Sequence, residues 1–443
     1  MNTFIYSFAP AVRLTGRRNF KCISPTSLLS GRNCFITCPH RAGWKARIGE
    51  TGAMNSTLLS KTAILLDVAG LFLKLGTTAF GGPASHIALM EQEAVVRRGW
   101  LSREEFLDLL GVANLLPGPT STELAIMIGY RRAGWIGLVL AGVCFIVPAA
   151  VMVSAIAWAY LKFGKLPEIR GLLYGIKPVI IAVVVQALWH LGRTAVKTWM
   201  LGVVGVGAAA LSYFGVNPLL VLLLIGVLMM ATRLRTQPQG ATACVAPLLG
   251  MTSAAPLAAA TATVTPFSLW ALALFFLKVG FVLFGSGYVL LAFLRADLVE
   301  HWHWLTENQL LDAVAVGQFT PGPVFTAATF IGYILGGPKA ALLATVAIFL
   351  PSFVLVAVSR PLAPRLRKSP PAGAFLDGVN VASLALMAVV AWQLGQAALV
   401  DWLTRGLAVA ATVWLLFYRV NSTWLILGGA ALGLARSVFQ AGP

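Results

Sequence analysis

The segment Phe72-Leu-Lys-Leu-Gly76 recurs as Phe276-Leu-Lys-Val-Gly280, and the offset between the two copies is 276 − 72 = 204 residues. The same offset relates Pro117-Gly-Pro119 to Pro321-Gly-Pro323. At an offset of 204 the alignment also pairs Phe80 with Phe284 and Trp100 with Trp304. From Gly129 onward the offset is 203, and the alignment pairs these residues: Gly129 and Gly332, Pro148 and Pro351, Gly175 and Gly378, Trp189 and Trp392. A register that holds over this distance predicts that the chain is an internal duplication.

The duplication divides the chain into four parts. We expect a basic leader at 1–53, an amino-terminal repeat at 54–232, a Thr-, Ala- and Pro-rich linker at 233–265 and a carboxyl-terminal repeat at 266–436. The leader is rich in Lys, Arg, Ser and Thr and has no sustained apolar run, which is typical of an organellar transit peptide and not of a secretory signal. In the alternative that we prefer, the protein starts at Met54, which opens a short polar lead into the first apolar segment.

The composition excludes a soluble globular protein. Hydrophobic residues make up 58% of the 443 residues and charged residues only 11%, whereas about 25% charged is usual in soluble domains. The apolar residues form blocks of roughly 20, the length that crosses a bilayer as a helix, without the alternation of a membrane β-barrel. We therefore predict an all-α, multi-pass membrane protein, a bundle of two homologous halves with about five or six membrane segments each.

The formal net charge of +18 does not indicate a nucleic-acid partner. Such an excess would suggest one in a soluble protein, but here most Lys and Arg residues lie between apolar blocks, where the positive-inside bias places them. Basic clusters at 162–170 and 360–368 occupy matching positions in the two repeats. The sequence therefore leaves open whether the repeats are parallel or inverted.

Glycine and proline interrupt the predicted membrane helices at matching positions. The first apolar helix of each half ends at Gly81-Gly-Pro83 or at Gly285-Ser-Gly287, and unwound backbone at membrane depth usually lines a cavity. Pro-Gly-Pro then divides the following helix, so that Leu107–Leu116 and Thr120–Tyr130 each extend roughly 15 Å, about half of the hydrocarbon core. We expect a broken helix or hairpin whose pieces meet at mid-depth, with a plain kink as the alternative.

Capping residues predict where these pieces begin. Ser102-x-x-Glu105 and Thr306-x-x-Gln309 are capping boxes that begin the helices before each Pro-Gly-Pro. The half-helix after each Pro-Gly-Pro has free amides at its start, and such a terminus attracts anions. Thr120-Ser-Thr-Glu123 is expected to close a capping box of its own, whereas Val324-Phe325-Thr326 has no such cap. The second-half terminus is therefore predicted to be the more available anion site.

Ionisable residues inside the apolar helices are functional candidates. Lys74 and Lys278 occupy the same position in the two halves, and two lysines near amide-rich helix ends would suit a compact dianion; snorkelling to the interface is the alternative. Glu123 is either a structural cap or a proton-coupling group. His86 is a second proton-coupling candidate, or else a hydrogen-bonded polar residue of the core.

The candidate substrate ligands are the two lysines together with residues of the helix breaks: Lys74, Lys278, Gly81, Gly82, Pro117, Gly118, Pro119, Thr120, Pro321, Gly322, Pro323 and Thr326. We expect no catalytic residue, no metal site and no cofactor. An intramembrane enzyme needs clustered carboxylates or metal ligands, and the intramembrane acids are few: Glu123, Asp108 and Asp312.

Several motifs resemble those of the chromate ion transporter family. They are Phe80-Gly-Gly-Pro-Ala-Ser-His-Ile87, Trp100-Leu-Ser-x-x-Glu-Phe106, Leu116-Pro-Gly-Pro119, Thr320-Pro-Gly-Pro323 and Phe349-Leu-Pro-Ser352. The resemblance covers nearly all of 60–436 and implies the long-chain, two-domain form of that family, whose members export chromate across the cytoplasmic membrane, with sulfate as a structural analogue and occasional substrate. This chain departs from many members at Thr120, where they have Glu.

We therefore expect a secondary transporter, not an enzyme, that exports chromate and confers chromate resistance. The chain has no Walker A or P-type phosphorylation motif, so an ion or proton gradient or a partner subunit must drive it. Uptake of sulfate or another oxyanion is the alternative, and an intramembrane enzyme is the least favoured function. The expected partners are a chromate- or sulfate-like oxyanion and the lipid bilayer, and a homodimer is compatible with the sequence. The expected location is the plasma or inner membrane, or an organellar membrane if the leader is a transit peptide.

Overall fold

The computed structural model describes residues 51–164, 166–236, 266–284, 289–367, 370–418 and 422–440. The predicted leader up to residue 50, most of the predicted linker and the break at Gly285-Ser-Gly287 lie outside this range. All regular structure in the described residues is helical, and four of their helices are long and apolar enough to cross a membrane: Thr120–Phe163, Gly171–Ala195, Val324–Ser359 and Pro371–Ala398. This confirms the predicted all-α membrane fold.

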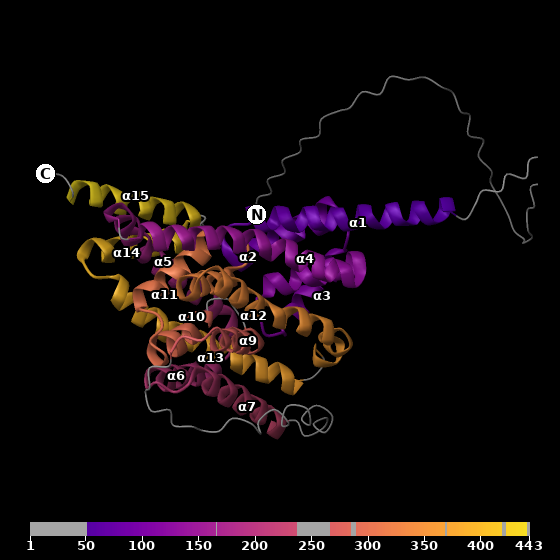
Figure 1. Cartoon of the computed structure of the whole chain (residues 1–443). Helices are drawn as coiled ribbons and strands as arrows, with labels where there is room; N and C mark the ends of the chain where they lie inside the picture. The colour runs from indigo at the N-terminus through magenta and orange to yellow at the C-terminus, as the bar shows by residue number, and fades with distance from the viewer. Residues whose placement is uncertain are drawn as a thin grey trace, which may run out of the picture. The chain divides into compact units, whose positions relative to one another are not determined.

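The two halves repeat the same series of elements (Figure 1). The first half contains α1 (Thr51–Thr78), α2 (Gly82–Glu91), the π-helix η1 (Gln92–Arg97), α3 (Arg103–Ala113), α4 (Thr120–Phe163), α5 (Pro167–Ala195), α6 (Trp199–Tyr213) and α7 (Pro218–Thr236). The second contains α9 (Leu269–Val282), α10 (Leu290–Phe293), η4 (Leu294–His301), α11 (Glu307–Phe319), η5 (Val324–Thr326), α12 (Ala327–Arg367), α13 (Pro370–Ala398), α14 (Trp402–Phe417) and α15 (Ser422–Gln440).

Both α4 and α12 are kinked near their beginning, α4 after 13 residues and α12 after nine. The backbone leaves the helical region at Ala133 and Gly134 in α4 and at Gly336 and Gly337 in α12, with φ of 64° at Gly134 and 72° at Gly337. Glycine adopts this left-handed conformation without steric cost. Each element is therefore a half-helix followed by a long membrane-spanning segment. We call the end of the bundle that contains the bend of α4 the α4-bend side, and the end that contains the bend of α12 the α12-bend side.

The Pro-Gly-Pro segment of the first half returns to the side from which it came. Arg131, at the end of the half-helix, pairs with Glu105 at the beginning of α3 at 3.3 Å, and the guanidinium of Arg132 lies 5.3 Å from the ring centre of Trp100. Because both ends meet, α3 and the half-helix form a re-entrant hairpin. The predicted capping box of Ser102 and Glu105 is present at its start, as is that of Thr306 and Gln309 in α11.

The hairpin of the second half enters from the opposite side. Tyr160, near the end of α4, donates a hydrogen bond to Asp312 of α11 at 2.9 Å, whereas the first hairpin begins beside the bend of α4. The intervening segment, 135–163, is roughly 43 Å long at 1.5 Å per residue, so it spans the bilayer. The repeats are therefore inverted with respect to each other, an arrangement shared by many secondary transporters.

Each Pro-Gly-Pro loop bonds to the broken first helix of the other half. The amide of Gly118 donates to the carbonyl of Leu283, at the end of α9, at 2.7 Å, and the amide of Gly322 donates to the carbonyl of Ala79, just after α1, at 3.0 Å. Both pairs obey the repeat offset, because 283 − 79 = 322 − 118 = 204. Two carbonyls that the helix breaks would leave unpaired at mid-depth are thus satisfied across the interface between the halves.

The long helices also pack across the halves. Helix α5 lies against α14 and α15, and α13 lies against α6 and α7 (Figure 1). In the first contact, Gly171 and Gly175 of α5 face Gly433 and Gly429 of α15 so closely that each glycine backbone occupies the space of the other's missing side chain. Small residues four apart allow this approach, which favours helix association in lipid.

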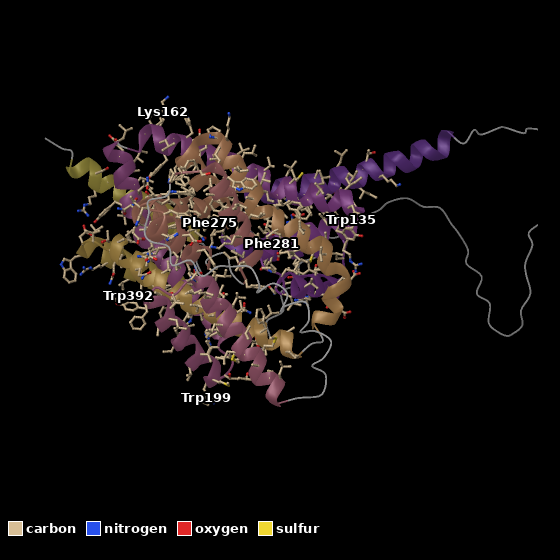
Figure 2. All side chains as sticks on the ribbon, turned by 60° about the horizontal axis from the view of Figure 1, so that its bottom comes forward. Trp135, Lys162, Trp199, Phe275, Phe281 and Trp392 are labelled. Carbon is tan, nitrogen blue, oxygen red and sulfur yellow. The ribbon has the colours of Figure 1, made fainter. Side chains whose placement is uncertain are left out.

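Apolar side chains cover much of the outer surface. Trp135, Trp199 and Trp392 project from their helices (Figure 2) and are 58%, 82% and 65% exposed. In a soluble protein such side chains would have to be covered, whereas lipid chains or the membrane interface solvate them favourably.

The glycine contact between α5 and α15 predicts a large difference between two adjacent positions. A Cβ at Gly429 would lie 2.5 Å from the carbonyl oxygen of Gly175, whereas a Cβ at Gly428 would meet nothing within 4 Å. We expect Gly429→Ala to destabilise the protein by about 1–3 kcal/mol through overpacking, with a clear decrease in the Tm of the detergent-purified protein. Gly428→Ala is the control and should leave the Tm unchanged; equal Tm values for both variants would contradict the close packing.

Candidate anion site

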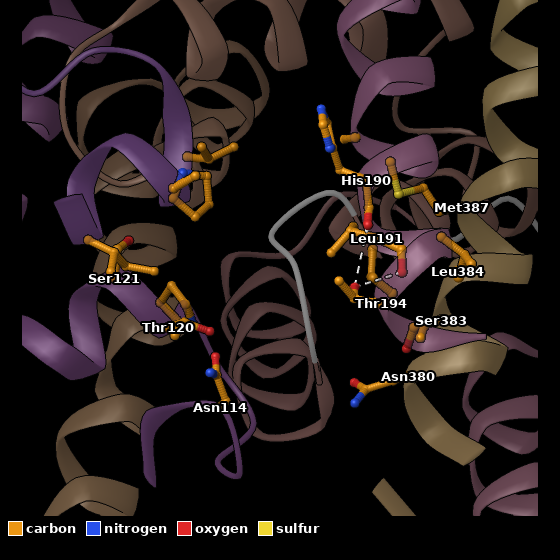
Figure 3. A pocket seen from close by; sticks show the side chains of 18 of the residues that line it. Asn114, Thr120, Ser121, His190, Leu191, Thr194, Asn380, Ser383, Leu384 and Met387 are labelled. Carbon is orange, nitrogen blue, oxygen red and sulfur yellow. Dashed lines mark hydrogen bonds between the residues drawn. The ribbon is translucent and has the colours of Figure 1, made fainter. Parts of the chain in front are cut away.

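A cavity of about 890 Å³ lies between the breaks of the first half and the helices α5 and α13 (Figure 3). On one wall are the beginning of α2 and the residues around the first Pro-Gly-Pro, among them Asn114, Thr120 and Ser121. The other wall consists of residues spaced one helical turn apart on α5 and α13. Its lining therefore combines two helix beginnings with a polar face contributed by both halves.

Both helix beginnings on the first wall are without side-chain caps. Helix α2 starts after Gly81, whose φ is 100°, and the half-helix of α4 starts after Pro119; neither of these N-cap residues bonds to the first amides through a side chain. Ser85 in the first case and Thr120 and Ser121 in the second add hydroxyl groups to the lining. Two uncapped helix N-termini and several hydroxyls form a favourable environment for an anion.

The expected capping box of Thr120 and Glu123 is wrong. Pro119 is the N-cap, so Thr120 is already the first helical residue and Glu123 lies one position beyond the N3 site that a capping box requires. The Glu123 side chain is fully buried instead, and its two carboxyl oxygens have no hydrogen-bond partner among the described residues. An added Cβ at Gly118 would lie 2.5 Å from Oε1 of Glu123 and 2.9 Å from Oγ of Ser352.

The two termini contribute different side chains to the cavity. In the second half, the short helix η5 precedes α12, and Oγ1 of Thr326 donates to the carbonyl of Pro323 at 2.8 Å. Only Val324 and Phe325 of this segment reach the cavity. The first-half terminus, which the sequence suggested was blocked by Glu123, therefore gives the cavity the hydroxyls of Thr120 and Ser121, whereas the second-half terminus gives it two apolar side chains.

Lys74 and Lys278 lie in equivalent ion pairs outside the lining. Nζ of Lys74 is 2.8 Å from Glu93, and Nζ of Lys278 is 2.9 Å from Asp297. Glu93 and Asp297 are themselves repeat partners, because 297 − 93 = 204. Each lysine therefore already has an acidic partner in its own half.

The other predicted ligands divide into two groups. Gly81, Pro119 and Thr120 line the cavity, whereas Gly82, Pro117, Gly118, Pro321, Gly322, Pro323 and Thr326 are absent from its lining. His86 is buried, and its Nε2 lies 3.1 Å from the carbonyl oxygen of Ala79, which also accepts the amide of Gly322. It occupies the hydrogen-bonded core position that the sequence allowed; its role in proton coupling, like that of Glu123, stays a prediction.

Sequence reasoning missed the second wall. It contains polar residues at helical spacing on α5 and α13: Gln186, His190 and Thr194, and Asp377, Asn380 and Ser383. The intervals of four and three residues between polar side chains in otherwise apolar helices were a usable signal. Lys197, in the connection between α5 and α6, completes this wall.

At the equivalent position in the second half, the described residues surround only a small void. A void of only about 10 Å³ is lined there by Leu290, Gln318 and Val324 among others, the repeat partners of His86, Asn114 and Thr120. Val324 borders both this void and the large cavity. The second Pro-Gly-Pro turn therefore separates the cavity from the equivalent region of the second half.

Comparison of the sequence with known proteins also divides the chain into two halves. The sequence model of the family described as chromate transporter matches the chain twice, at residues 66–230 and 270–434. A chromate transport protein of Cupriavidus metallidurans is 32% identical over 86% of this chain and 96% of its own length. A probable chromate transport protein of Synechococcus elongatus is 32% identical over 84% and 95%, and a chromate transport protein of Pseudomonas aeruginosa is 30% identical over 82% and 90%. No solved structure matches the chain. With both halves matched and relatives aligned over nearly their whole length, the chain belongs to the chromate transporter family.

Proposed function

We propose that this protein is a secondary transporter that exports chromate across the cytoplasmic membrane and thereby confers chromate resistance. The observation that carries the proposal is the cavity at the uncapped helix beginnings after Gly81 and Pro119, in a member of a family whose relatives are named for chromate transport. Free amides and hydroxyls are suitable donors for the oxygens of a tetrahedral dianion.

The binding position that we propose lies at the first turn of the α4 half-helix. Thr120 and Ser121 each provide a backbone amide and a hydroxyl there, and Asn114 lies on the same wall (Figure 3). Val324 and Phe325 of the second half also line the cavity. An anion bound at this level would lie near the middle of the bilayer, where the two Pro-Gly-Pro loops meet the opposite half.

The distribution of basic residues supports the direction of export. The cavity reaches Thr194 and Lys197 at the end of α5, on the α4-bend side. Among the basic residues whose side chains the structure describes, more lie at this end (Arg97, Arg98, Arg103, Arg131, Arg132, Arg193, Lys197, Arg233) than at the other (Lys162, Lys177, Arg295, Lys339, Arg405, Arg436). The positive-inside bias then assigns the α4-bend side to the cytoplasm, so the cavity collects its substrate from the cytoplasm.

Export predicts lower chromate content in cells that produce the full chain than in cells with an empty vector. The measurement is chromium content after a short exposure to chromate, with and without excess sulfate, together with growth inhibition by chromate. Higher chromium content that sulfate suppresses would indicate uptake of sulfate-like anions and would overturn the proposed direction.

The proposed binding position predicts that Thr120→Val combined with Ser121→Ala lowers transport by about ten-fold, because two hydroxyl donors to a charged group are lost. Chromate transport into proteoliposomes of known orientation measures this effect. Thr412→Val is the control, since the hydroxyl of Thr412 bonds to a carbonyl of its own helix. Transport by the double variant at the rate of this control would exclude the position.

The role of Lys74 and Lys278 as substrate ligands can be tested separately in the Lys74→Met/Lys278→Met variant. Because each lysine pairs with an acid outside the cavity lining, we expect a lower Tm and little change in the Kd for chromate. Lost chromate binding at an unchanged Tm would instead establish the lysines as ligands, as the sequence suggested.

A further inference from the structure

One ion pair lies in the wall of the cavity. Nζ of Lys197 is 2.8 Å from Oδ1 of Asp377, and both residues line the cavity. Lys197 belongs to the connection between α5 and α6 of the first half, whereas Asp377 belongs to α13 of the second. Among the described lining residues these two carry a full charge, and His190 is the remaining titratable one.

The position of Lys197 is fixed by the two helices that it joins. Helix α5 ends at Ala195, and Thr198 caps α6 with its side chain. The side chain of Lys197 is 61% exposed and that of Asp377 is 36% exposed. A pair this accessible to solvent contributes little to stability, so the lysine can exchange one anionic partner for another at low cost.

The pair has no counterpart in the second half. The residue equivalent to Lys197 is Val400, and the residue equivalent to Asp377 is Tyr174, each at an offset of 203. Tyr174 bonds to Asp401, which pairs with Arg436 at 2.7 Å. At these two positions, a lysine and an aspartate are therefore paired in the half-interface that contains the cavity, and a valine and a tyrosine replace them in the other.

We propose that Lys197 is the cation that first binds the oxyanion, at the end of the cavity on the α4-bend side and before the anion reaches Thr120 and Ser121, and that Asp377 holds this lysine until the anion displaces it. The inference rests on the proposed oxyanion transport and adds to it a cationic ligand and an internal competitor. A dianion carries twice the charge of the aspartate, so it competes effectively for the ammonium group. The competition also keeps affinity moderate, and moderate affinity lets a transported ion leave its site.

The experiment measures binding of sulfate and of chromate to the purified full-length protein in lipid nanodiscs, by calorimetry at constant ionic strength. We expect Lys197→Gln to raise the Kd about ten-fold, because a charge-assisted contact is lost, and Lys197→Arg to stay near the unaltered value. Asp377→Asn should lower the Kd, since its lysine is freed. The double variant Lys197→Gln/Asp377→Asn should bind like Lys197→Gln alone.

Lys162→Gln serves as the control. Lys162 lies beside Trp158 at the carboxyl-terminal end of α4, away from the α4-bend side, and does not line the cavity. An unchanged Kd in Lys197→Gln would overturn the proposal. Weaker binding in Asp377→Asn would also overturn it, because the ion pair would then be a purely structural contact. If the unaltered protein binds sulfate but does not transport chromate, the proposed function fails while the sulfate data still decide the role of Lys197. Absence of binding for both anions would overturn both.

Discussion

The arrangement of the two halves depends on two reciprocal hydrogen bonds near mid-membrane. Each joins the glycine amide of one Pro-Gly-Pro loop to the carbonyl of the residue just after the other half's interrupted helix, Gly118 to Leu283 and Gly322 to Ala79. Broken helices leave backbone groups that neither lipid nor their own helix can satisfy. Because the partners come from the opposite half, each half is complete only in the presence of the other.

Inversion of the halves brings these loops to the same depth from opposite sides, and differences between the repeats then make the interface unequal. Glu123 and Ser352 flank the first loop at Gly118, whereas Ala149 and backbone carbonyls flank the second at Gly322. Thr120 and Ser121 face the open cavity, and their counterparts there are Val324 and Phe325. A symmetric scaffold thus carries an asymmetric site, with donors on one side and an apolar barrier on the other.

The sequence was informative where a local pattern determines structure. The constant offset revealed the duplication, and the capping boxes at Ser102 and Thr306 begin helices as expected. The sequence was misleading where a shift of one residue decided the outcome, as at the start of the α4 half-helix, where Pro119 and not Thr120 is the N-cap. It was also uninformative about the direction that the chain takes after a helix break. Glu93 pairs with Lys74 from 19 residues away because the chain turns back after Ala79, and the wall formed by α5 and α13 requires packing between halves that no local pattern encodes.

The packing of α5 on α15 also affects how the protein is made. Gln440, at the end of α15, follows Ala195, at the end of α5, by 440 − 195 = 245 residues. At about 5–20 residues per second, α5 waits roughly 12 to 50 seconds after its own synthesis for the helix that fits its glycine face. During this time the groove around Gly171 and Gly175 is open to lipid or to the insertion machinery. The contact between α5 and α15 therefore forms only after α15 has been made, and a ribosome that stops before α14 leaves a chain in which the glycine face of α5 has no partner.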